Sequence, residues 1–342
     1  MRLPLTHTDV VGVTIAIVTY NGNSRLGPTL EHLAQQEGLD FNCELLVIDN
    51  ASTDGTAEFV KAFWQQLKSP YPLQVVHEAR PGTMYAREAA ISSAQYRYLL
   101  FCDDDNWLSA HNAHTAFYYI RQDSGIAALG GKGIMTYEPG FEVPDWMCER
   151  YERSFGTGSQ GVDDGDISQT KGSLYTAGAL FDRVWLDQLY RRGFTSSLKG
   201  RDGKSLVAGE DTELTMALKL IGGRLHYSSQ LEFRHYMPSG RMQWSYLKRL
   251  WFAFGQSNYV LEPYYKRGDT NTLFQYYKEL VKTILRYSYH ALKFAILDTK
   301  EGDQRLLNYE QFKGRLYALL FKRAQYHMTR RMVNALKTQN DV

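Results

Sequence analysis

The sequence contains the stretch LLFCDDDNWL at residues 99–108, where an apolar run ends in three consecutive acids. The apolar run predicts a buried strand, and Asp103, Asp104 and Asp105 follow it directly. Adjacent carboxylates repel one another and lose hydration when they are partly buried, so another group must neutralise them. A divalent cation is one candidate, because hard cations take carboxylate and phosphate oxygens as ligands. The alternative is a solvated turn that also caps the next helix.

Strands and helices are expected to alternate around this stretch. Runs rich in apolar and β-branched residues predict strands at residues 13–19, 43–49, 73–78 and 96–102. The helices expected between them cover about residues 24–36, 54–67 and 83–94. This order predicts an α/β fold with a doubly wound, mostly parallel, Rossmann-like sheet. Polar residues follow each predicted strand, at the carboxyl edge where such sheets bind their ligands.

The next part of the chain is less regular. Residues 125–175 show no clear periodicity, which predicts long functional loops. YTAGALF at 175–181 is typical of a strand, and GEDTELTMALKLIGG predicts a helix that begins near Glu210 and Asp211. GRLHY and LEFRHY then predict two short strands.

The pattern after residue 240 is entirely helical, which predicts two parts, 1–240 and 241–342. The helices are expected at about residues 243–260, 273–297 and 304–336. Residues 1–240 hold 21 Lys and Arg against 29 Asp and Glu, whereas residues 241–342 hold 18 against 8. Three uses of the basic helices remain open: packing on the acidic part, contact between copies in a homo-oligomer, or peripheral contact with a membrane or a lipid-linked acceptor.

The cysteine content and the lengths of the apolar runs indicate the cellular compartment in which the protein is expected. Cys43, Cys102 and Cys148 are widely spaced and form no metal-binding or redox motif. No apolar run reaches the length of a membrane span. We therefore expect a cytoplasmic protein, with the inner membrane face as the site of any peripheral contact, and no nucleic-acid partner.

Five segments resemble, in sequence and in order, the family-2 nucleotide-sugar glycosyltransferases. They are VTIAIVTYN, LLVIDNASTDGT, YAREAAI, YLLFCDDDNWL and GEDTELTMALKLIGG. The resemblance covers about residues 11–240 and leaves the C-terminal helices outside it. It implies an inverting enzyme with a GT-A fold, a doubly wound, mostly parallel sheet that is followed here by a helical segment.

The resemblance also implies a metal site and a donor site. Asp105 matches the last residue of the family's Asp-x-Asp motif, which holds Mn²⁺ or Mg²⁺, and His235 is either a second metal ligand or a packed histidine. The positions implied to bind the donor are Thr19, Tyr20, Asp49, Asn50, Arg87, Asp103, Asp104 and Gly178. The family often has Asp at the position of Asn50 and Asn at that of Glu88, so the pocket differs in detail. Close strand packing is the alternative for Gly178.

An inverting transfer needs a base that takes the proton from the acceptor hydroxyl as it attacks. The resemblance implies that Asp211 is this base and that Glu210 orients Asp211 or the acceptor. Both acids lie in the first turn of a predicted helix, so stabilisation of the helix dipole is the alternative. Trp146, Tyr151 and Trp185 are candidates for stacking on a sugar, with core or loop packing as their alternative.

Together these features imply a hexosyl- or N-acetylhexosaminyltransferase of polysaccharide biosynthesis. It would use a nucleotide sugar, by default a UDP-sugar, and a saccharide or lipid-linked saccharide acceptor. A nucleotidyltransferase acting on a sugar phosphate shares the nucleotide site and acidic metal ligands, but it gives no role to Glu210 and Asp211. A non-catalytic nucleotide-sugar-binding module is the other alternative. The sequence leaves the sugar, the acceptor and the linkage open.

Overall fold

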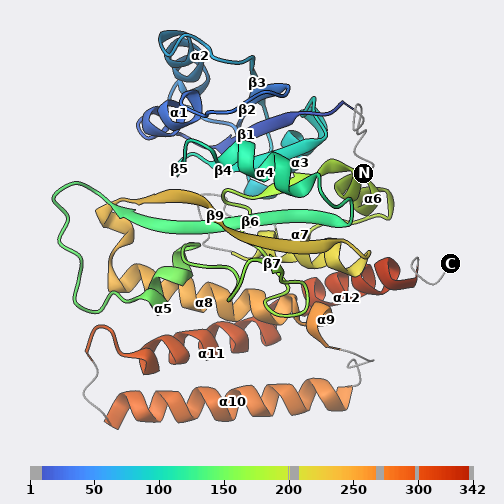
Figure 1. Cartoon of the computed structure of the whole chain (residues 1–342). Helices are drawn as coiled ribbons and strands as arrows, with labels where there is room; N and C mark the ends of the chain where they lie inside the picture. The colour runs from blue at the N-terminus through green and yellow to red at the C-terminus, as the bar shows by residue number, and fades with distance from the viewer. Residues whose placement is uncertain (1–9, 199, 201–207, 267–272, 297–299, 339–342) are drawn as a thin grey trace.

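The molecule consists of a nine-stranded mixed sheet with helices on both faces and a further layer of C-terminal helices (Figure 1). A computed structural model describes residues 10–198, 200, 208–266, 273–296 and 300–338. The strand order is β3-β2-β1-β4-β8-β6-β9-β5, with β7 paired to β9 outside this path. The C-terminal helices, orange and red in Figure 1, lie beneath the β6 and β9 part of the sheet.

The first half of the sheet is parallel, as predicted. Its strands are β3 (Leu73–His77), β2 (Cys43–Asp49), β1 (Val13–Thr19) and β4 (Tyr98–Asp103). In the register of this sheet Thr19 pairs with Asp49, and Val18 pairs with Asp103. The carboxyl ends of these strands are therefore level at one edge, where the predicted donor-binding residues lie.

Alternate strand residues face opposite layers of helices. Val13, Ile15 and Ile17 of β1 pack under α1 (Leu26–Ala34), α2 (Thr56–Gln66) and α4 (Asn112–Ile120). Ala16 faces the layer formed by α3 (Thr83–Ser93), α6 (Arg183–Arg191) and α7 (Glu210–Leu220). This period of two is what a strand buried on both faces requires. The doubly wound fold expected from the sequence is confirmed.

The second half of the sheet differs from the sequence prediction. Two long parallel strands, β6 (Ile126–Tyr137) and β9 (Arg224–Met237), dominate it. Residues 125–175, predicted to be irregular, therefore include a twelve-residue strand, and the segments GRLHY and LEFRHY form one strand rather than two. The predicted strand at 175–181 is reduced to β8 (Leu180–Asp182), which runs antiparallel to β4 and β6.

The glycines of β6 are the reason why the sequence pattern did not predict this strand. The register of β6 against β9 shifts between Gly130 and Lys132, which marks an irregularity in the ladder. A Cβ atom built on Gly131 would lie only 1.9 Å from the carbonyl oxygen of Leu231. The glycine is thus required by a close backbone approach, although glycine disfavours strands in general.

The C-terminal layer contains five helices in the part of the chain that the structure describes. They are α8 (Trp244–Val260), α9 (Glu262–Tyr265), α10 (Leu273–Ile296), α11 (Gln304–Phe321) and α12 (Arg323–Thr338). The single helix predicted at 304–336 is wrong: α11 ends at Phe321 and α12 begins at Arg323. Tyr326 packs against Tyr259 of α8 with ring centroids 5.0 Å apart, so tertiary packing stabilises the turn without a glycine or proline.

The other predicted helix ends agree closely with the structure. The helix expected at 243–260 corresponds to α8, and the helix expected at 273–297 corresponds to α10, with residue 297 outside the described part of the chain. No helix among the described residues has both the length and the hydropathy of a membrane span. The division of the chain into two domains at residue 240 stays a prediction.

Helices α8 and α11 touch through their backbones. A Cβ atom on Gly255 of α8 would lie 2.0 Å from the carbonyl oxygen of Gln311, and one on Gly314 of α11 would lie 2.0 Å from that of Phe252. Neither distance can be tolerated by a real side chain, so each glycine is needed for the other helix to approach.

We expect Gly314→Ala to lower the free energy of unfolding by about 1–3 kcal/mol, because the methyl group would push α8 and α11 apart. Alanine favours a helix over glycine by up to about 1 kcal/mol, so a net loss isolates the packing effect. Urea denaturation followed by circular dichroism measures the change. Gly27→Ala in α1 is the control, because its Cβ would meet only Phe63 at 3.8 Å and Phe59 at 4.0 Å. Equal stability changes in the two variants would contradict the backbone contact.

Candidate active site

The three consecutive acids at the end of β4 have different surroundings: Asp104 and Asp105 each form an ion pair with an arginine, and Asp103 lies near the charge of Arg87. Asp103 is the last residue of β4, and Asp104 and Asp105 lead into β5 (Asn106–Leu108). All three lie at the edge of the sheet that the sequence predicted. Their separate partners answer the question of how the like charges are tolerated.

Asp104 is neutralised by Arg25. The Arg25 guanidinium donates from Nε to Asp104 Oδ1 at 2.9 Å and from Nη2 to Oδ2 at 2.7 Å. Thr19 Oγ1 donates to the same Oδ2 at 2.6 Å, and Thr29 Oγ1 donates to the Asp104 carbonyl oxygen at 3.0 Å. Burial raises the pKa of Asp104, and the hydrogen bonds from Arg25 oppose this effect. The predicted donor residues Asp104 and Thr19 therefore contact each other, and Arg25 and Thr29 fasten the start of α1 to the turn after β4.

Asp105 is buried between His235 and Arg241. His235 Nε2 lies 3.3 Å from Asp105 Oδ1, and Arg241 Nη1 donates to Oδ2 at 2.8 Å. Burial alone would raise the pKa of Asp105, but the charges and hydrogen bonds of His235 and Arg241 outweigh it and hold the pKa below its usual value. The carboxylate is therefore ionised at neutral pH.

The pairing of β5 with β9 brings His235 to this position. In that antiparallel ladder Asn106 is opposite His235, and Tyr236 N–H donates to the Asp105 carbonyl oxygen at 2.9 Å. Arg241 follows in the short helix η2 (Ser239–Arg241) directly after β9. The imidazole and the guanidinium beside Asp105 thus come from one continuous segment. The sequence indicated His235, whereas nothing in it indicated Arg241.

Arg87 connects the strand-end acids to the acids of α7. Its Nη1 lies 3.5 Å from Glu210 Oε1, and both side chains are largely buried. Burial raises the pKa of Asp103, and the charge of Arg87 opposes that rise, so the guanidinium also lies near Asp103. The structure therefore brings together Arg87, Asp103 and Glu210, which lie on three different elements.

Glu210 and Asp211 differ in their surroundings although they are adjacent in the sequence. Glu210 is 8% exposed, whereas Asp211 is more open. Asp211 Oδ1 accepts a hydrogen bond from Thr212 N–H at 3.0 Å within the first turn of α7. An acid in the first turn of a helix also interacts favourably with the helix dipole. Asp211 can therefore stabilise the start of α7 and still have a catalytic role.

A lysine that the sequence analysis missed lies near Asp211. Lys171 Nζ donates to Gln160 Oε1 at 3.0 Å and lies 3.9 Å from the centre of the Tyr175 ring. Burial lowers the pKa of Lys171 to about 8, and the nearby charge of Asp211 opposes the shift. Lys171 lies in a loop without a recognisable motif, so no sequence signal could have found it.

The predicted nucleotide-binding residues share the carboxyl edge but differ in their contacts. Tyr20 is 49% exposed directly after β1. Asp49 Oδ1 accepts a hydrogen bond from Ser52 N–H at 3.0 Å. Asn50 Nδ2 donates to the carbonyl oxygens of Glu78 at 3.0 Å and Arg80 at 2.7 Å, while its Oδ1 accepts from Gly82 N–H. The Asn50 amide therefore holds the turn before α3.

The remaining candidates are distributed around the sheet. Gly178 has a φ of +63°, and a Cβ there would lie 2.6 Å from the Phe233 ring, so close packing explains this glycine. Trp185 donates to the Ser124 carbonyl oxygen just before β6, which places it at the edge opposite Asp105. Trp185 is therefore unsuited to contact a sugar at the strand ends.

Trp146 and Tyr151 lie beside a broad open groove together with Trp244. The ring centroids of Trp146 and Trp244 are 5.2 Å apart, and those of Tyr151 and Trp244 are 5.9 Å apart. Met242 and Gln243 also line this groove, directly after Arg241 in the chain. One wall of the groove is therefore formed by the segment that follows Arg241.

The protein supplies few metal ligands at this edge. No group of three His, Cys, Asp or Glu side chains that could hold a metal ion occurs among the residues that the structure describes. Asp105 and His235 lie next to each other, and both are of residue types that bind metal ions. A metal ion here would need further ligands from a bound molecule or from water.

Sequence comparisons relate the chain to known proteins. Residues 14–165 match the sequence model for Glycosyl transferase family 2. The chain is 26% identical over 259 residues to the succinoglycan biosynthesis protein ExoM of Rhizobium meliloti (strain 1021). This alignment covers 73% of this chain and 75% of that protein. It is 25% identical over 122 residues to the poly(ribitol-phosphate) beta-N-acetylglucosaminyltransferase TarS of Staphylococcus aureus (strain Mu50), which covers 35% of this chain and 21% of that protein.

Two solved structures share the fold. Residues 1–349 of S. aureus TarS in complex with UDP-GlcNAc align with a TM-score of 0.51 at 17% identity, over 97% of this chain and 91% of that chain. The mannosyltransferase PcManGT from Pyrobaculum calidifontis, in complex with GDP-Man and Mn²⁺, aligns with a TM-score of 0.54 at 15% identity. The alignment covers 99% of this chain and 90% of that chain. The expected GT-A fold is confirmed.

We expect Arg25→Ala to lower the free energy of unfolding by about 1–3 kcal/mol, because it leaves the buried Asp104 carboxylate without its charged donor. Thermal and urea unfolding at neutral pH measure the loss. Arg191→Ala is the matched control, because Arg191 is 71% exposed in its ion pair with Asp187 and should contribute at most about 0.5 kcal/mol. A loss for Arg25→Ala no larger than for the control would exclude Asp104 as the structural link between α1 and β4.

Proposed function

We propose that this chain, a glycosyltransferase with a family 2 domain over residues 14–165, transfers a sugar from a nucleoside diphosphate sugar to an acceptor hydroxyl group. The observation that carries the proposal is Asp105 between His235 and Arg241 at the carboxyl edge, two residues after Asp103, which lies near the Arg87 that pairs with Glu210 of α7. A UDP-sugar is the donor that we favour, because the TarS structure holds UDP-GlcNAc. PcManGT holds GDP-Man, so a GDP-sugar is the second candidate.

The acceptor that we propose is a saccharide or a lipid-linked saccharide of a surface polysaccharide. ExoM is described as a succinoglycan biosynthesis protein, and TarS acts on poly(ribitol-phosphate). In the groove that Met242 and Gln243 line, Tyr151 and Trp244 are buried, but the partly exposed ring of Trp146 supports this class of acceptor, because sugar rings pack their apolar faces on aromatic side chains.

The residues present fit a divalent cation. Asp105 Oδ1 and His235 Nε2 lie 3.3 Å apart, and both are groups of metal-ligand type that together would hold the ion. His235 Nδ1 is buried without a hydrogen-bond partner among the described residues, whereas its other ring nitrogen, Nε2, faces Asp105. The Asp105 carboxylate is a ligand that suits manganese or magnesium, and phosphate oxygens of the donor would supply further ligands. When bound, the cation would stabilise negative charge on the leaving diphosphate.

Several side chains of the chain would position the donor. Tyr20 offers an exposed ring beside Thr19 and Asp49, where a nucleobase could stack and accept hydrogen bonds. Asp103 lies on the other side of β1, within reach of a ribose. Arg87 and Arg241 carry positive charge on either side of the acids and would attract the diphosphate. Asn50 would act indirectly by holding the turn before α3.

Asp211 is the base in the mechanism that we propose. The acceptor oxygen attacks the anomeric carbon, the bond from that carbon to the diphosphate oxygen breaks, and Asp211 takes the hydroxyl proton. A single displacement of this kind inverts the anomeric configuration. The openness of Asp211 suits contact with the acceptor, whereas the buried Glu210 suits a positioning role through its ion pair with Arg87.

A nucleotidyltransferase and a non-catalytic binding module remain the competing proposals, and one assay separates all three. Incubation with a nucleotide sugar and Mn²⁺ but no acceptor should release free sugar and nucleoside diphosphate slowly. A nucleotidyltransferase would instead release a sugar phosphate when pyrophosphate is added. A binding module would release neither product while still binding the nucleotide.

We expect Asp105→Ala to abolish the Mn²⁺-dependent part of donor binding, because it removes the ionised carboxylate of the two-ligand site. Differential scanning fluorimetry with UDP, a panel of nucleotide sugars and Mn²⁺ measures this loss, since ligand binding raises the melting temperature by mass action. Asp163→Ala, which removes an exposed loop carboxylate, should behave as the unaltered protein. Full Mn²⁺-dependent stabilisation of Asp105→Ala would rule out the metal assignment.

We expect Asp211→Asn to retain donor binding and to lose about 10²–10⁴-fold in turnover, because the amide cannot accept the acceptor proton. The measurements are the same fluorimetric titration and a coupled assay for released nucleoside diphosphate. Asp163→Asn serves as the matched control in both. If Asp211→Asn turned over at near-normal rates, the base would have to be another residue.

A further inference from the structure

Helix α10 exposes a row of large apolar side chains along its length. The row, called the α10 stripe below, consists of Leu273, Phe274, Tyr277, Val281, Ile284, Leu285, Tyr289 and Leu292, whose exposed fractions range from 41% to 77%. Their spacing follows the helical period, so they occupy one side of the helix. A row of this size is unusual on a surface that faces only water.

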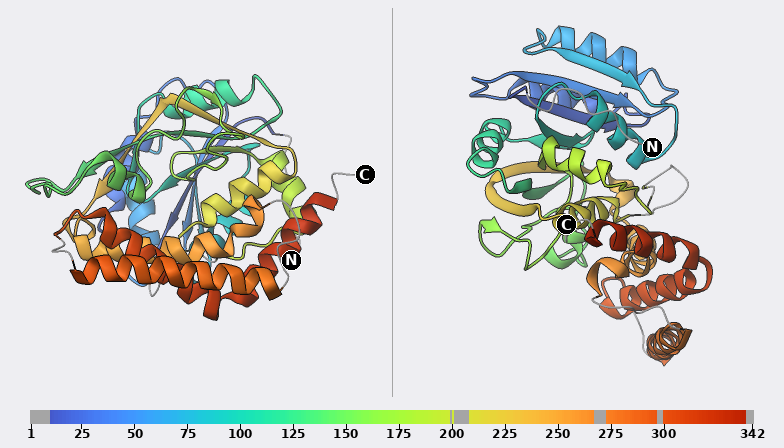
Figure 2. Two further views of the ribbon diagram at one scale, coloured as in Figure 1. Left: turned by 90° about the horizontal axis from the view of Figure 1, so that it is seen from below. Right: turned by 90° about the vertical axis from the view of Figure 1, so that its right-hand side faces the viewer.

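The opposite side of α10 provides its contacts with the rest of the molecule. Tyr287 stacks on Tyr309 of α11 with ring centroids 5.2 Å apart, and His290 stacks on Phe312 at the same distance. α10 is the helix farthest from the sheet in both directions of view (Figures 1 and 2). The helix thus packs through polar aromatic residues and leaves its most apolar side chains outside.

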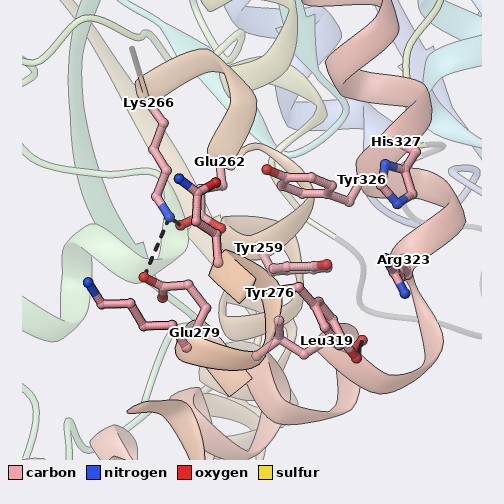
Figure 3. Close-up of a pocket in the computed structure, with 11 residues that line it drawn as sticks. Tyr259, Glu262, Lys266, Tyr276, Glu279, Leu319, Arg323, Tyr326 and His327 are labelled. Atoms are coloured by element: carbon pink, nitrogen blue, oxygen red, sulfur yellow. Dashed lines mark hydrogen bonds and ion pairs between the residues drawn. The ribbon is translucent and has the colours of Figure 1, made fainter. Parts of the chain in front are cut away.

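The charges of α10 are arranged just as unevenly. Lys282, Arg286 and Lys293 follow one another along the border of the stripe, and Lys278 lies near its start. The one acid of the helix, Glu279, turns toward the helical layer and lies 3.7 Å from Lys266 (Figure 3). It also lies 3.2 Å from Arg315 of α11. The outer side of α10 therefore carries positive charges and no acid.

We propose that the α10 stripe lies in the surface of an anionic lipid membrane. Such surfaces bind helices that lie flat, with apolar and aromatic side chains among the acyl chains and lysines at the headgroups. The lack of outward acids on α10 favours this occupant over a second copy of the chain, because two such helices would bring like charges together. The proposal is independent of the reaction at the Asp105 site.

Flotation of the purified full chain with vesicles tests the proposal. We expect binding to vesicles of phosphatidylglycerol and phosphatidylcholine in equal parts, and little binding to phosphatidylcholine alone. Lys278→Gln with Lys282→Gln should weaken binding about fivefold for each charge removed. Leu285→Ser with Leu292→Ser should weaken it by at least about tenfold, and both leucines are exposed, so the fold should tolerate the change.

Matched substitutions away from α10 serve as controls. Lys61→Gln with Lys68→Gln removes two exposed lysines near α2, and Val143→Ser with Val162→Ser removes two exposed valines. Both should bind like the unaltered protein. Absence of binding to anionic vesicles at low salt would overturn the proposal, as would equal losses in the control variants. A dimer in sedimentation velocity that Leu285→Ser with Leu292→Ser dissolves would assign the stripe to a second copy instead.

Discussion

Neutralisation of three consecutive carboxylates is the constraint on which the arrangement of this molecule depends. The acids of the 103–105 run have different neighbours: the charge of Arg87 acts on Asp103, Arg25 pairs with Asp104, and Arg241 pairs with Asp105 beside the His235 imidazole. These partners come from the loop after β1, from α3, and from the end of β9 with η2. A buried carboxylate without a partner costs several kcal/mol, so the electrostatics of one turn fix how these segments meet.

This arrangement also separates the acids into different physical states. Asp104 is held by a bidentate guanidinium and a hydroxyl group, and its oxygens serve the fold. Asp105 is equally buried, but its partners keep its pKa low and one of them is an imidazole of metal-ligand type. Identical residues in adjacent positions thus acquire distinct roles from their neighbours in space, which a sequence motif alone cannot specify.

The sequence predicted the parts of the molecule that depend on local pattern. The β-branched runs gave the four parallel strands, and their common edge followed from topology. Three features could not be predicted because they depend on distant contacts: the pairing of Arg25 with Asp104, the Arg241 contact with Asp105, and the glycine-rich strand β6, which exists because Gly131 admits the Leu231 backbone. The break between α11 and α12 belongs to the same class, since Tyr326 and Tyr259 stabilise it through tertiary packing.

The glycine contact between α8 and α11 limits where residues can be inserted into or deleted from the chain. Gly255 and Gly314 fix which turn of α8 lies against α11, and α8 begins three residues after Arg241. One residue inserted between Trp244 and Gly255 would advance the helix by about 1.5 Å and rotate it by about 100°. Either the crossing point or the guanidinium on Asp105 would then be displaced. The number of residues between Trp244 and Gly255 is therefore fixed. Insertions or deletions after Gly255 leave the distance from the helix contact to Arg241 unaltered.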